Sequence, residues 1–398
     1  MKNYYIDNII GKMAQNIKDM IDQTIITQEK KIVLYGLDTY SFAMRTILSN
    51  FGFKTDSYIS ENKELLIKYK RNVNAIKARY LNSSRDLIKI CSVEERLLPF
   101  DDQVIIINGS KYCPQDEIER LNYQKDVQFF QAYDWEDDNF IQTTTGKTRV
   151  TLGEIQGIEK DMLYIIDKFC IDKGLRYWVC GGTLLGTLRH KGFIPWDDDI
   201  DIFMPWEDYK RFSEEFAGDE RYSLITPDKA DRRDYISFFT KMTDNRTLVR
   251  EDIGSIRCIR PITLDIFPLI GLPNEQEERQ LFFMQYYEME KKIWEDFYGN
   301  NGDLNAFNKW YPTQRGFLER YDFDHSDYVG VLGTVYKERD QTTRKVYEST
   351  IRMPFEDIEV NVPIGYREYL DNLYGKDWME LPDENKRISN HNVEIFWL

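Results

Sequence analysis

In the first third of the chain, apolar residues at helical spacing alternate with short continuous apolar runs. The helical spacing occurs at residues 9–21 and again at residues 42–48. Between and after these helices come short apolar runs that are typical of buried strands. These predicted strands are residues 31–36, 56–59 and 103–108. Because strands that alternate with helices favour a parallel sheet, we predict a Rossmann-like α/β domain over residues 1–140, with an amphipathic N-terminal helix.

A polar stretch, residues 134–150, separates this domain from a second set of patterns and is predicted to be a linker. Residues 151–173 predict a long amphipathic helix, and the run 177–204 predicts two apolar strands joined by a Gly-Gly turn and a short helix. The remaining predicted elements are helices at 207–216, 275–298 and 366–374, a hairpin of 237–243 with 247–250 turning at Asp244–Asn245, a strand at 262–269 and a hairpin at 353–363. We predict a second, α+β domain over residues 151–398, with helical C-terminal elaborations.

Composition narrows the class of protein. The 398 residues carry a net charge of −15, which argues against a nucleic-acid binder, since such proteins need a basic surface. Five scattered cysteines without a CxxC pair are typical of reduced thiols in a cytoplasmic protein. The N-terminus lacks the build of a signal peptide, and no apolar run is long enough to span a bilayer. We therefore expect a cytoplasmic protein without a transmembrane segment, which can still contact the inner face of the membrane peripherally.

The turn after the first predicted strand bears on dinucleotide binding. The GxGxxG fingerprint would place glycines at positions 36, 38 and 41, but only Gly36 is present, and Asp38 and Ser41 take the other two positions. Asp38 would also repel a pyrophosphate. The sequence favours a structural or partner-binding domain, and binding of NAD or a sugar nucleotide to this half is the alternative.

Four carboxylates gather near the end of the run 177–204. Asp199 and Asp201 are two positions apart, so in an extended strand they point to one face, roughly 6.5–7 Å apart along the chain. Asp265 lies in a later apolar strand, where a carboxylate is costly unless it is paired or bound to a cation. Three such carboxylates on neighbouring strands suit Mg²⁺ or Mn²⁺ shared with substrate phosphates. The alternative is a solvated acidic turn, with Asp265 hydrogen-bonded structurally.

Other side chains near this run are candidate substrate contacts. A Gly-Gly turn that opens a helix offers backbone N–H groups to an anion, and basic side chains can neutralise a phosphate. The candidate contacts are Gly181, Gly182, Thr183, Arg189 and Lys241. A surface position is the alternative for both basic residues. Trp196 either stacks on a ligand ring or wedges a loop against the core, and His190 is expected to be a structural or rim residue.

The run from Gly181 to Asp201, with Leu264–Leu269 and Phe355–Met379, resembles the signature of the LicD/fukutin-type phospho-alcohol transferases. These belong to the nucleotidyltransferase-fold superfamily, whose pattern is a Gly-Gly or Gly-Ser turn, a DxD strand and a third acidic residue on a later strand. The resemblance covers residues 155–385 and omits the N-terminal domain. It implies a nucleotidyltransferase-like catalytic domain at 151–398.

The resemblance also implies roles for the carboxylates and a reaction. Asp199, Asp201 and Asp265 would hold Mg²⁺ or Mn²⁺, and Asp197 would support the site or bind a second ion. The reaction would transfer a phospho-alcohol from a CDP-linked donor to a hydroxyl of a cell-surface glycan or its lipid-linked precursor, and release CMP. CDP-choline is the favoured donor, with CDP-glycerol and CDP-ribitol as alternatives. The glycan would be of the teichoic acid, capsule or lipopolysaccharide type.

Two other functions compete with this interpretation. A metal-dependent glycosyltransferase also uses a DxD motif, but the upstream Gly-Gly turn and the downstream Asp265 disfavour it. A catalytically silent binding protein would need no acidic triad. Screening a CDP-alcohol against UDP- and GDP-sugars as donors distinguishes a glycosyltransferase from a phospho-alcohol transferase. Absence of Mg²⁺-dependent nucleotide binding would favour the silent binding protein.

Overall fold

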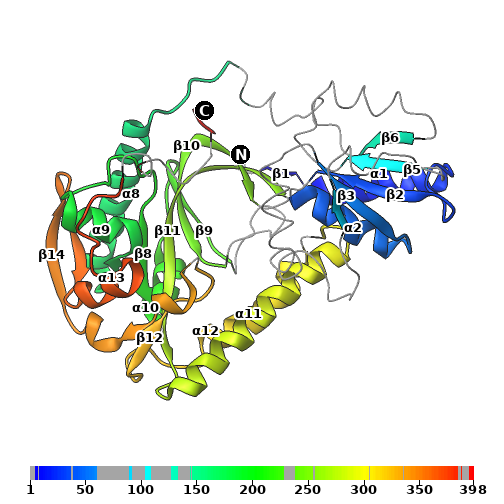
Figure 1. Cartoon of the computed structure of the whole chain (residues 1–398). Coiled ribbons are helices and arrows are strands. Elements are labelled where there is room, and N and C mark those ends of the chain that lie inside the picture. The colour runs from blue at the N-terminus through cyan, green and yellow to red at the C-terminus, as the bar shows by residue number, and fades with distance from the viewer. Residues whose placement is uncertain are drawn as a thin grey trace.

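The computed structural model contains a parallel sheet near the N-terminus and a larger mixed sheet built mainly from the later part of the chain (Figure 1). The structure describes residues 5–7, 9–36, 39–60, 89–91, 104–108, 127–132, 144, 146–227, 238–253, 256–303, 305–334, 336–383, 387 and 394–398. Asp38 and most of the predicted linker 134–150 lie outside the described residues.

The N-terminal sheet is entirely parallel, with strand order β4-β3-β2-β5-β6. Its strands are β2 (Lys31–Tyr35), β3 (Thr55–Ile59), β4 (Lys89–Cys91), β5 (Val104–Asn108) and β6 (Val127–Gln131). Helices α1 (Ile9–Asp22) and α2 (Thr39–Asn50) have the predicted helical spacing, and the apolar face of α1 is buried. The α/β class and the parallel sheet are thus confirmed, while the Rossmann-like assignment and the boundary at residue 140 stay predictions.

The second sheet is built on two long antiparallel strands, β10 (Thr240–Ile253) and β11 (Ile256–Leu272). At one end, β8 (Asp201–Pro205) lies parallel to β11, and β7 (Trp178–Val179) pairs antiparallel with β8. The strands that extend this sheet are β9 (Tyr222–Ile225) and β16 (Glu394–Trp397) beside β10, β1 (Tyr5–Asp7) and β12 (Tyr328–Gly330) beside β11, and β13 (Thr342–Thr343) beside β12.

Helices and a hairpin surround this mixed sheet. The helices are α8 (Leu152–Lys173), α9 (Gly181–Arg189), α10 (Trp206–Glu215), α11 (Gln276–Gly299), α12 (Asn305–Leu318), α13 (Tyr366–Tyr374) and the 3-10 turns Lys337–Asp340 and Arg344–Tyr347. Strands β14 (Thr350–Phe355) and β15 (Ile358–Pro363) form the predicted hairpin. Thr151 starts α8 with a capping box, and Gly174 ends it in the left-handed region at φ 66°. No helix in the described part of the chain is long and apolar enough to cross a membrane.

One predicted hairpin is wrong. Asp244 and Asn245 do not form a turn, because β10 continues through them as one strand with a register shift between Asp244 and Val249. The buried Asp244 carboxylate accepts hydrogen bonds from Arg221 and Arg246, and Thr247 Oγ1 donates to the Asp244 carbonyl at 2.8 Å. These bonds satisfy the polar groups inside the sheet, so the polar pair produces a bulge where the sequence predicts a turn.

The start of β8 also differs from the prediction. The strand begins at Asp201, and Asp197, Asp198 and Asp199 lie in the loop that leads into it. The expectation that Asp199 and Asp201 lie in one strand is therefore wrong. Ile200 and Ile202 are fully buried, as predicted.

Candidate active site

Asp201 and Asp265 lie side by side on parallel neighbouring strands. They are direct partners in the register of β8 with β11, and the Asp265 N–H donates to the carbonyl of Ile200 at 3.0 Å. Both residues are therefore fixed at the same level of the sheet, where their carboxylates flank each other at one end of β8. The prediction that these two acids lie on adjacent strands is confirmed.

The Gly-Gly turn packs directly against two carboxylates. The Cys180 N–H donates to the Asp201 carbonyl at 3.1 Å, and the Asp201 N–H donates to Thr183 Oγ1 at 2.9 Å. A Cβ atom at Gly182 would lie 2.8 Å from Oδ2 of Asp197, and one at Gly181 would lie 3.5 Å from Oδ2 of Asp201. The lack of a side chain at Gly182 thus lets an acidic loop approach the N-terminus of α9, where the helix dipole favours negative charge.

Two neighbouring elements hold the acidic loop in place. On α8, Gln156 Nε2 donates to the Asp197 carbonyl at 2.9 Å. At the tip of the β14–β15 hairpin, Glu356 accepts a hydrogen bond from the Phe193 N–H at 3.0 Å and donates its own N–H to the Lys191 carbonyl at 2.8 Å. The loop between α9 and β8 is therefore supported by segments from both sides of it in the sequence.

Lys241 supplies a positive charge beside these acids. It is the partner of Asp265 in the register of β10 with β11, and its Nζ lies 2.6 Å from both carboxylate oxygens of Asp265. The ammonium also lies 4.7 Å from the ring centroid of Phe239. Both side chains are largely but not completely buried, with Lys241 at 14% and Asp265 at 23% exposure, so an ammonium reaches the same face as the carboxylates.

Several carboxylates converge on this partly buried region. Burial raises the pKa of Asp201 well above its usual range, and the charges of Asp199 and Asp265 raise it further against the opposing effect of Lys241. Glu159 on α8 is 2% exposed, and burial followed by the charge of Asp199 raises its pKa as well. Its Oε2 atom has no hydrogen-bond partner among the described residues. Such a cluster favours a cationic partner.

A divalent cation fits the chemistry of this cluster, although the ligands are not preassembled. Among the described residues, no group of three metal-ligating side chains is arranged to hold an ion, and Asp265 is turned to Lys241. Carboxylate oxygens are nevertheless the ligands that Mg²⁺ and Mn²⁺ prefer, and Oε2 of the buried Glu159 has no hydrogen-bond partner among the described residues. The predicted roles of Asp199, Asp201 and Asp265 as metal ligands stay predictions.

Comparison with known proteins identifies the family. The family model described as "LicD/FKTN/FKRP, nucleotidyltransferase domain" matches residues 174–257. A lipopolysaccharide cholinephosphotransferase, LicD of Haemophilus influenzae, is 29% identical over 268 residues, which are 63% of this chain and 99% of that protein. The chain contains a LicD-family domain and is homologous to LicD and FKRP.

Two further matches cover only a small part of the proteins to which this chain is aligned. The human ribitol 5-phosphate transferase FKRP is 44% identical over 52 residues, which are 13% of this chain and 10% of FKRP. The mannosyltransferase regulator 4 of Saccharomyces cerevisiae is 23% identical over 264 residues, 62% of this chain and 20% of that protein. The LicD-type match at 174–257 includes the Gly-Gly turn, the acidic loop and Lys241, and ends before Asp265.

The other predicted contacts of this LicD-family chain have structural partners. Arg189 donates to the carbonyls of Trp378 and Glu380, both at 3.0 Å, so its guanidinium ties the C-terminal segment to α9. The Thr183 hydroxyl accepts from Asp201, as described above. Trp196 is partly buried and packs edge-to-face with His190, the residue that caps α9. Whether Arg189, Thr183 and Trp196 also touch a substrate stays a prediction.

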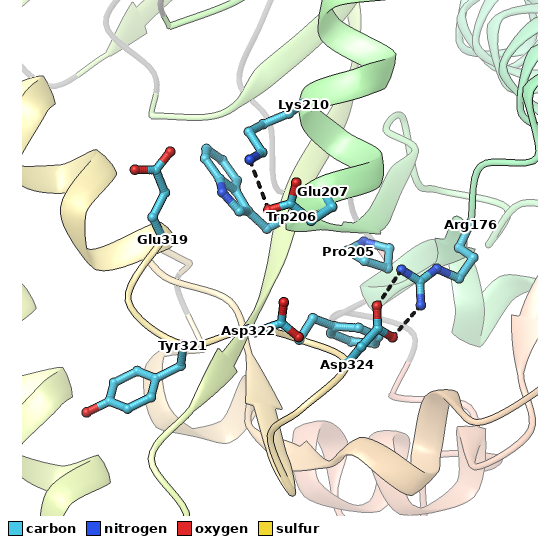
Figure 2. Close-up of a pocket in the computed structure, with 10 residues that line it drawn as sticks. Arg176, Pro205, Trp206, Glu207, Lys210, Glu319, Tyr321, Asp322 and Asp324 are labelled. Carbon is cyan, nitrogen blue, oxygen red and sulfur yellow. Dashed lines mark hydrogen bonds and ion pairs between the residues drawn. The ribbon is translucent and has the colours of Figure 1, made fainter.

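A pocket of about 240 Å³ lies at the opposite end of β8 and does not include the acidic cluster. Figure 2 shows Arg176, Trp206, Lys210 and Asp324 around it, with Arg176 paired to Asp324 and Lys210 paired to Glu207. Pro205, the last residue of β8, lines this pocket, whereas Asp201 is the first residue of the same strand. The acids of the LicD-type site therefore face a different part of the surface.

The sequence does not predict three further residues near the site, Gln156, Glu159 and Tyr369. The Tyr369 hydroxyl accepts a hydrogen bond from the Gly181 N–H at 3.2 Å. One signal was available for Glu159: it stands four residues after Ile155 and three before Met162, so it lies on the apolar face of its helix. A carboxylate on such a face needs a partner, which points to a site. No comparable signal was available for Tyr369, because a tyrosine in an amphipathic helix is ordinary core.

Proposed function

We propose that this LicD-family protein transfers a phospho-alcohol from a CDP-linked donor to a hydroxyl of a glycan, in a reaction that depends on a divalent cation and releases CMP. Phosphocholine from CDP-choline is the favoured transfer, since the relative aligned over 99% of its own length is named a cholinephosphotransferase. The acceptor would be a cell-surface glycan of the teichoic acid, capsule or lipopolysaccharide type, or its lipid-linked precursor. The reaction would take place in the cytoplasm, at the inner face of the membrane where the acceptor is lipid-linked.

One arrangement carries this proposal: the N-terminus of α9 lies against Asp197 and Asp201, and Asp201 lies beside Asp265. A helix N-terminus binds phosphate oxygens through its first backbone N–H groups. Carboxylates at the same point supply hard oxygen ligands for a cation that is shared with those phosphates. A nucleoside diphosphate donor needs both features at one place, because its pyrophosphate carries the negative charge that must be neutralised.

The residues of the chain take separate parts in the reaction. The N–H groups of Gly182 and Thr183 hold donor phosphate oxygens, and the Lys241 ammonium stabilises negative charge on the transferred phosphate. Asp199, Asp201 and Asp265 would hold Mg²⁺ or Mn²⁺, which would supply positive charge to offset that of the pyrophosphate. Asp197 stays against the Gly-Gly turn and supports the loop.

The transfer itself is a displacement at phosphorus. The oxygen of the acceptor hydroxyl forms a bond to the phosphorus that carries the alcohol, and the bond from that phosphorus to the bridging pyrophosphate oxygen breaks. CMP leaves with the bonding electron pair, and a carboxylate of the cluster accepts the hydroxyl proton.

A donor panel tests the proposal. The full chain is incubated with CDP-choline, CDP-glycerol, CDP-ribitol, UDP-glucose and GDP-mannose, each with Mg²⁺ and a mixture of candidate glycan acceptors. We expect CMP release with a CDP-alcohol, loss of that release with EDTA, and no activity in a folded Asp199→Ala variant. Release of UDP or GDP from the nucleotide sugars would favour a glycosyltransferase, and full activity of Asp199→Ala would overturn the assignment.

A further inference from the structure

Two buried polar residues behind the Gly-Gly turn have no part in the chemistry described above. Tyr369 lies on α13 with 1% of its surface exposed, and Asp340 ends a 3-10 turn with 1% exposed. They come from segments more than 150 residues beyond Gly181 in the sequence. A tyrosine hydroxyl and a carboxylate buried this deeply are costly unless they bind each other or the backbone, so their partners indicate what they do.

The Tyr369 hydroxyl connects Asp340 to the first peptide of α9. It accepts a hydrogen bond from the Gly181 N–H at 3.2 Å and donates to Oδ1 of Asp340 at 3.3 Å. The Thr334 hydroxyl donates to the other oxygen of the same carboxylate. The tyrosine ring is held edge-to-face against Phe203 of β8 at 5.8 Å, so the hydroxyl has a fixed position between the two segments.

The direction of these bonds follows from the chemistry of the groups. An ionised carboxylate only accepts hydrogen bonds, so the single hydroxyl hydrogen of Tyr369 points to Asp340. The lone pairs of the hydroxyl then face away from Asp340 and accept the Gly181 N–H. Gly181 has φ 52°, a left-handed conformation that glycine adopts without the steric cost that a side chain would bring.

This contact affects how the helix can receive an anion. The first three N–H groups of α9, those of Gly181, Gly182 and Thr183, have no acceptor within the helix. Because Tyr369 accepts from the first, only the next two remain to face a phosphate, and their direction is set by the orientation of the peptide that Tyr369 holds.

We propose that Tyr369 and Asp340 are positioning residues for the phosphate-binding turn: they orient the Gly181 peptide so that the N–H groups of Gly182 and Thr183 face the donor diphosphate. The phosphate-binding role of the turn rests on the proposed function. The relay of hydrogen bonds from Asp340 through Tyr369 to Gly181 does not depend on that function and is tested separately.

The first test uses hydrogen–deuterium exchange of the full chain. Tyr369→Phe removes one oxygen atom and leaves the Gly181 N–H without its acceptor, so amides in a peptide spanning 179–184 should exchange faster. Tyr58→Phe is the matched control, since Tyr58 is a fully buried tyrosine of β3 whose hydroxyl has no partner among the described residues. Equal exchange in wild type and Tyr369→Phe would overturn the relay.

The second test measures CDP-choline binding by calorimetry in the presence of Mg²⁺. We expect Tyr369→Phe and Asp340→Ala each to weaken binding by about tenfold, and the double variant to be no weaker than either single one, because the two residues act through one bond. Asp340→Asn keeps an acceptor oxygen for Tyr369 and should restore binding. Additive losses, or no rescue by Asn, would contradict the proposal.

The two tests separate the possible failures. Faster exchange in Tyr369→Phe without CDP-choline binding to wild type would refute the proposed donor and leave the relay in place. If Tyr369→Phe does not fold, hydrogen exchange at 179–184 and CDP-choline binding are compared between Asp340→Ala and Asp340→Asn, which leave the tyrosine ring unchanged. Unchanged exchange at 179–184 in Asp340→Ala would then overturn the relay.

Discussion

Lys241 contacts both carboxylate oxygens of Asp265 at 2.6 Å, and Asp265 is in turn the strand neighbour of Asp201. A cation that binds Asp265 therefore has to share this carboxylate with an ammonium. Lys241 and the cation therefore compete for the Asp265 carboxylate, although the positive charge of each would attract a phosphate to the same place.

Replacing Lys241 should separate these two effects. We expect Lys241→Met to bind Mn²⁺ about tenfold more tightly, since a nearby positive charge is removed, and to transfer phospho-alcohol more slowly. Electron paramagnetic resonance of free Mn²⁺ measures the first and CMP release the second. Lys160→Met, which breaks a pair with the largely exposed Asp357, is the control and should leave Mn²⁺ affinity unchanged. A Lys241→Met variant that binds Mn²⁺ no better would contradict the competition.

Gly182 should tolerate no side chain. In Gly182→Ala the new Cβ would lie 2.8 Å from Asp197 Oδ2, so the carboxylate and its loop must shift. We expect transfer to fall by about 100-fold, because small displacements at a reacting centre have effects of this size. Gly157→Ala is the matched control: nothing lies within 4 Å of the new atom, and the helix interior should gain about 1 kcal/mol in the free energy of unfolding. Activity near wild type in Gly182→Ala would show that the loop adapts.

Arg189 offers a test between a structural and a substrate role. Its guanidinium donates to two carbonyls of the C-terminal segment, so Arg189→Ala should increase hydrogen exchange across residues 376–381. The same experiment with Arg211→Ala, whose pair with Glu215 is exposed, should leave that segment unchanged. A weaker affinity for CDP-choline without faster exchange at 376–381 would instead assign Arg189 to the phosphate.

Asp340 should make stability depend on pH. Burial raises the pKa of Asp340 from 3.8 to about 6, so the unfolded chain loses this proton at lower pH than the folded chain does. The contribution of this group is therefore most favourable below about pH 4 and is lost as pH rises through 6. Asp340→Asn removes this dependence and keeps an acceptor for Tyr369.

Urea unfolding at pH 4 and pH 7.5 measures this effect. The difference in unfolding free energy between Asp340→Asn and wild type should shift in favour of Asn by roughly 3 kcal/mol between these values, since about two pKa units separate the two states. A difference that stays constant over this range would show that Asp340 ionises normally.

The sequence by itself determined the elements of this protein and the kind of site they carry. Helical and strand periodicities are local properties, so α8, β5 and α13 could be predicted within a few residues. The Gly-Gly turn and the acidic positions are also local, and they were enough to indicate a phosphate and cation site. The family resemblance rests on the same short runs.

Only the tertiary structure decided which residues meet. The register that sets Asp201 beside Asp265, the approach of Glu159 and Gln156 from α8, and the Tyr369–Asp340 relay all join segments that are far apart in the sequence. Packing also overruled two local signals: arginines that satisfy Asp244 turned a predicted hairpin into one bulged strand, and β8 started at Asp201. A pattern along the chain reports which side of an element is buried, whereas the contacts of a buried polar group depend on the elements that pack against it.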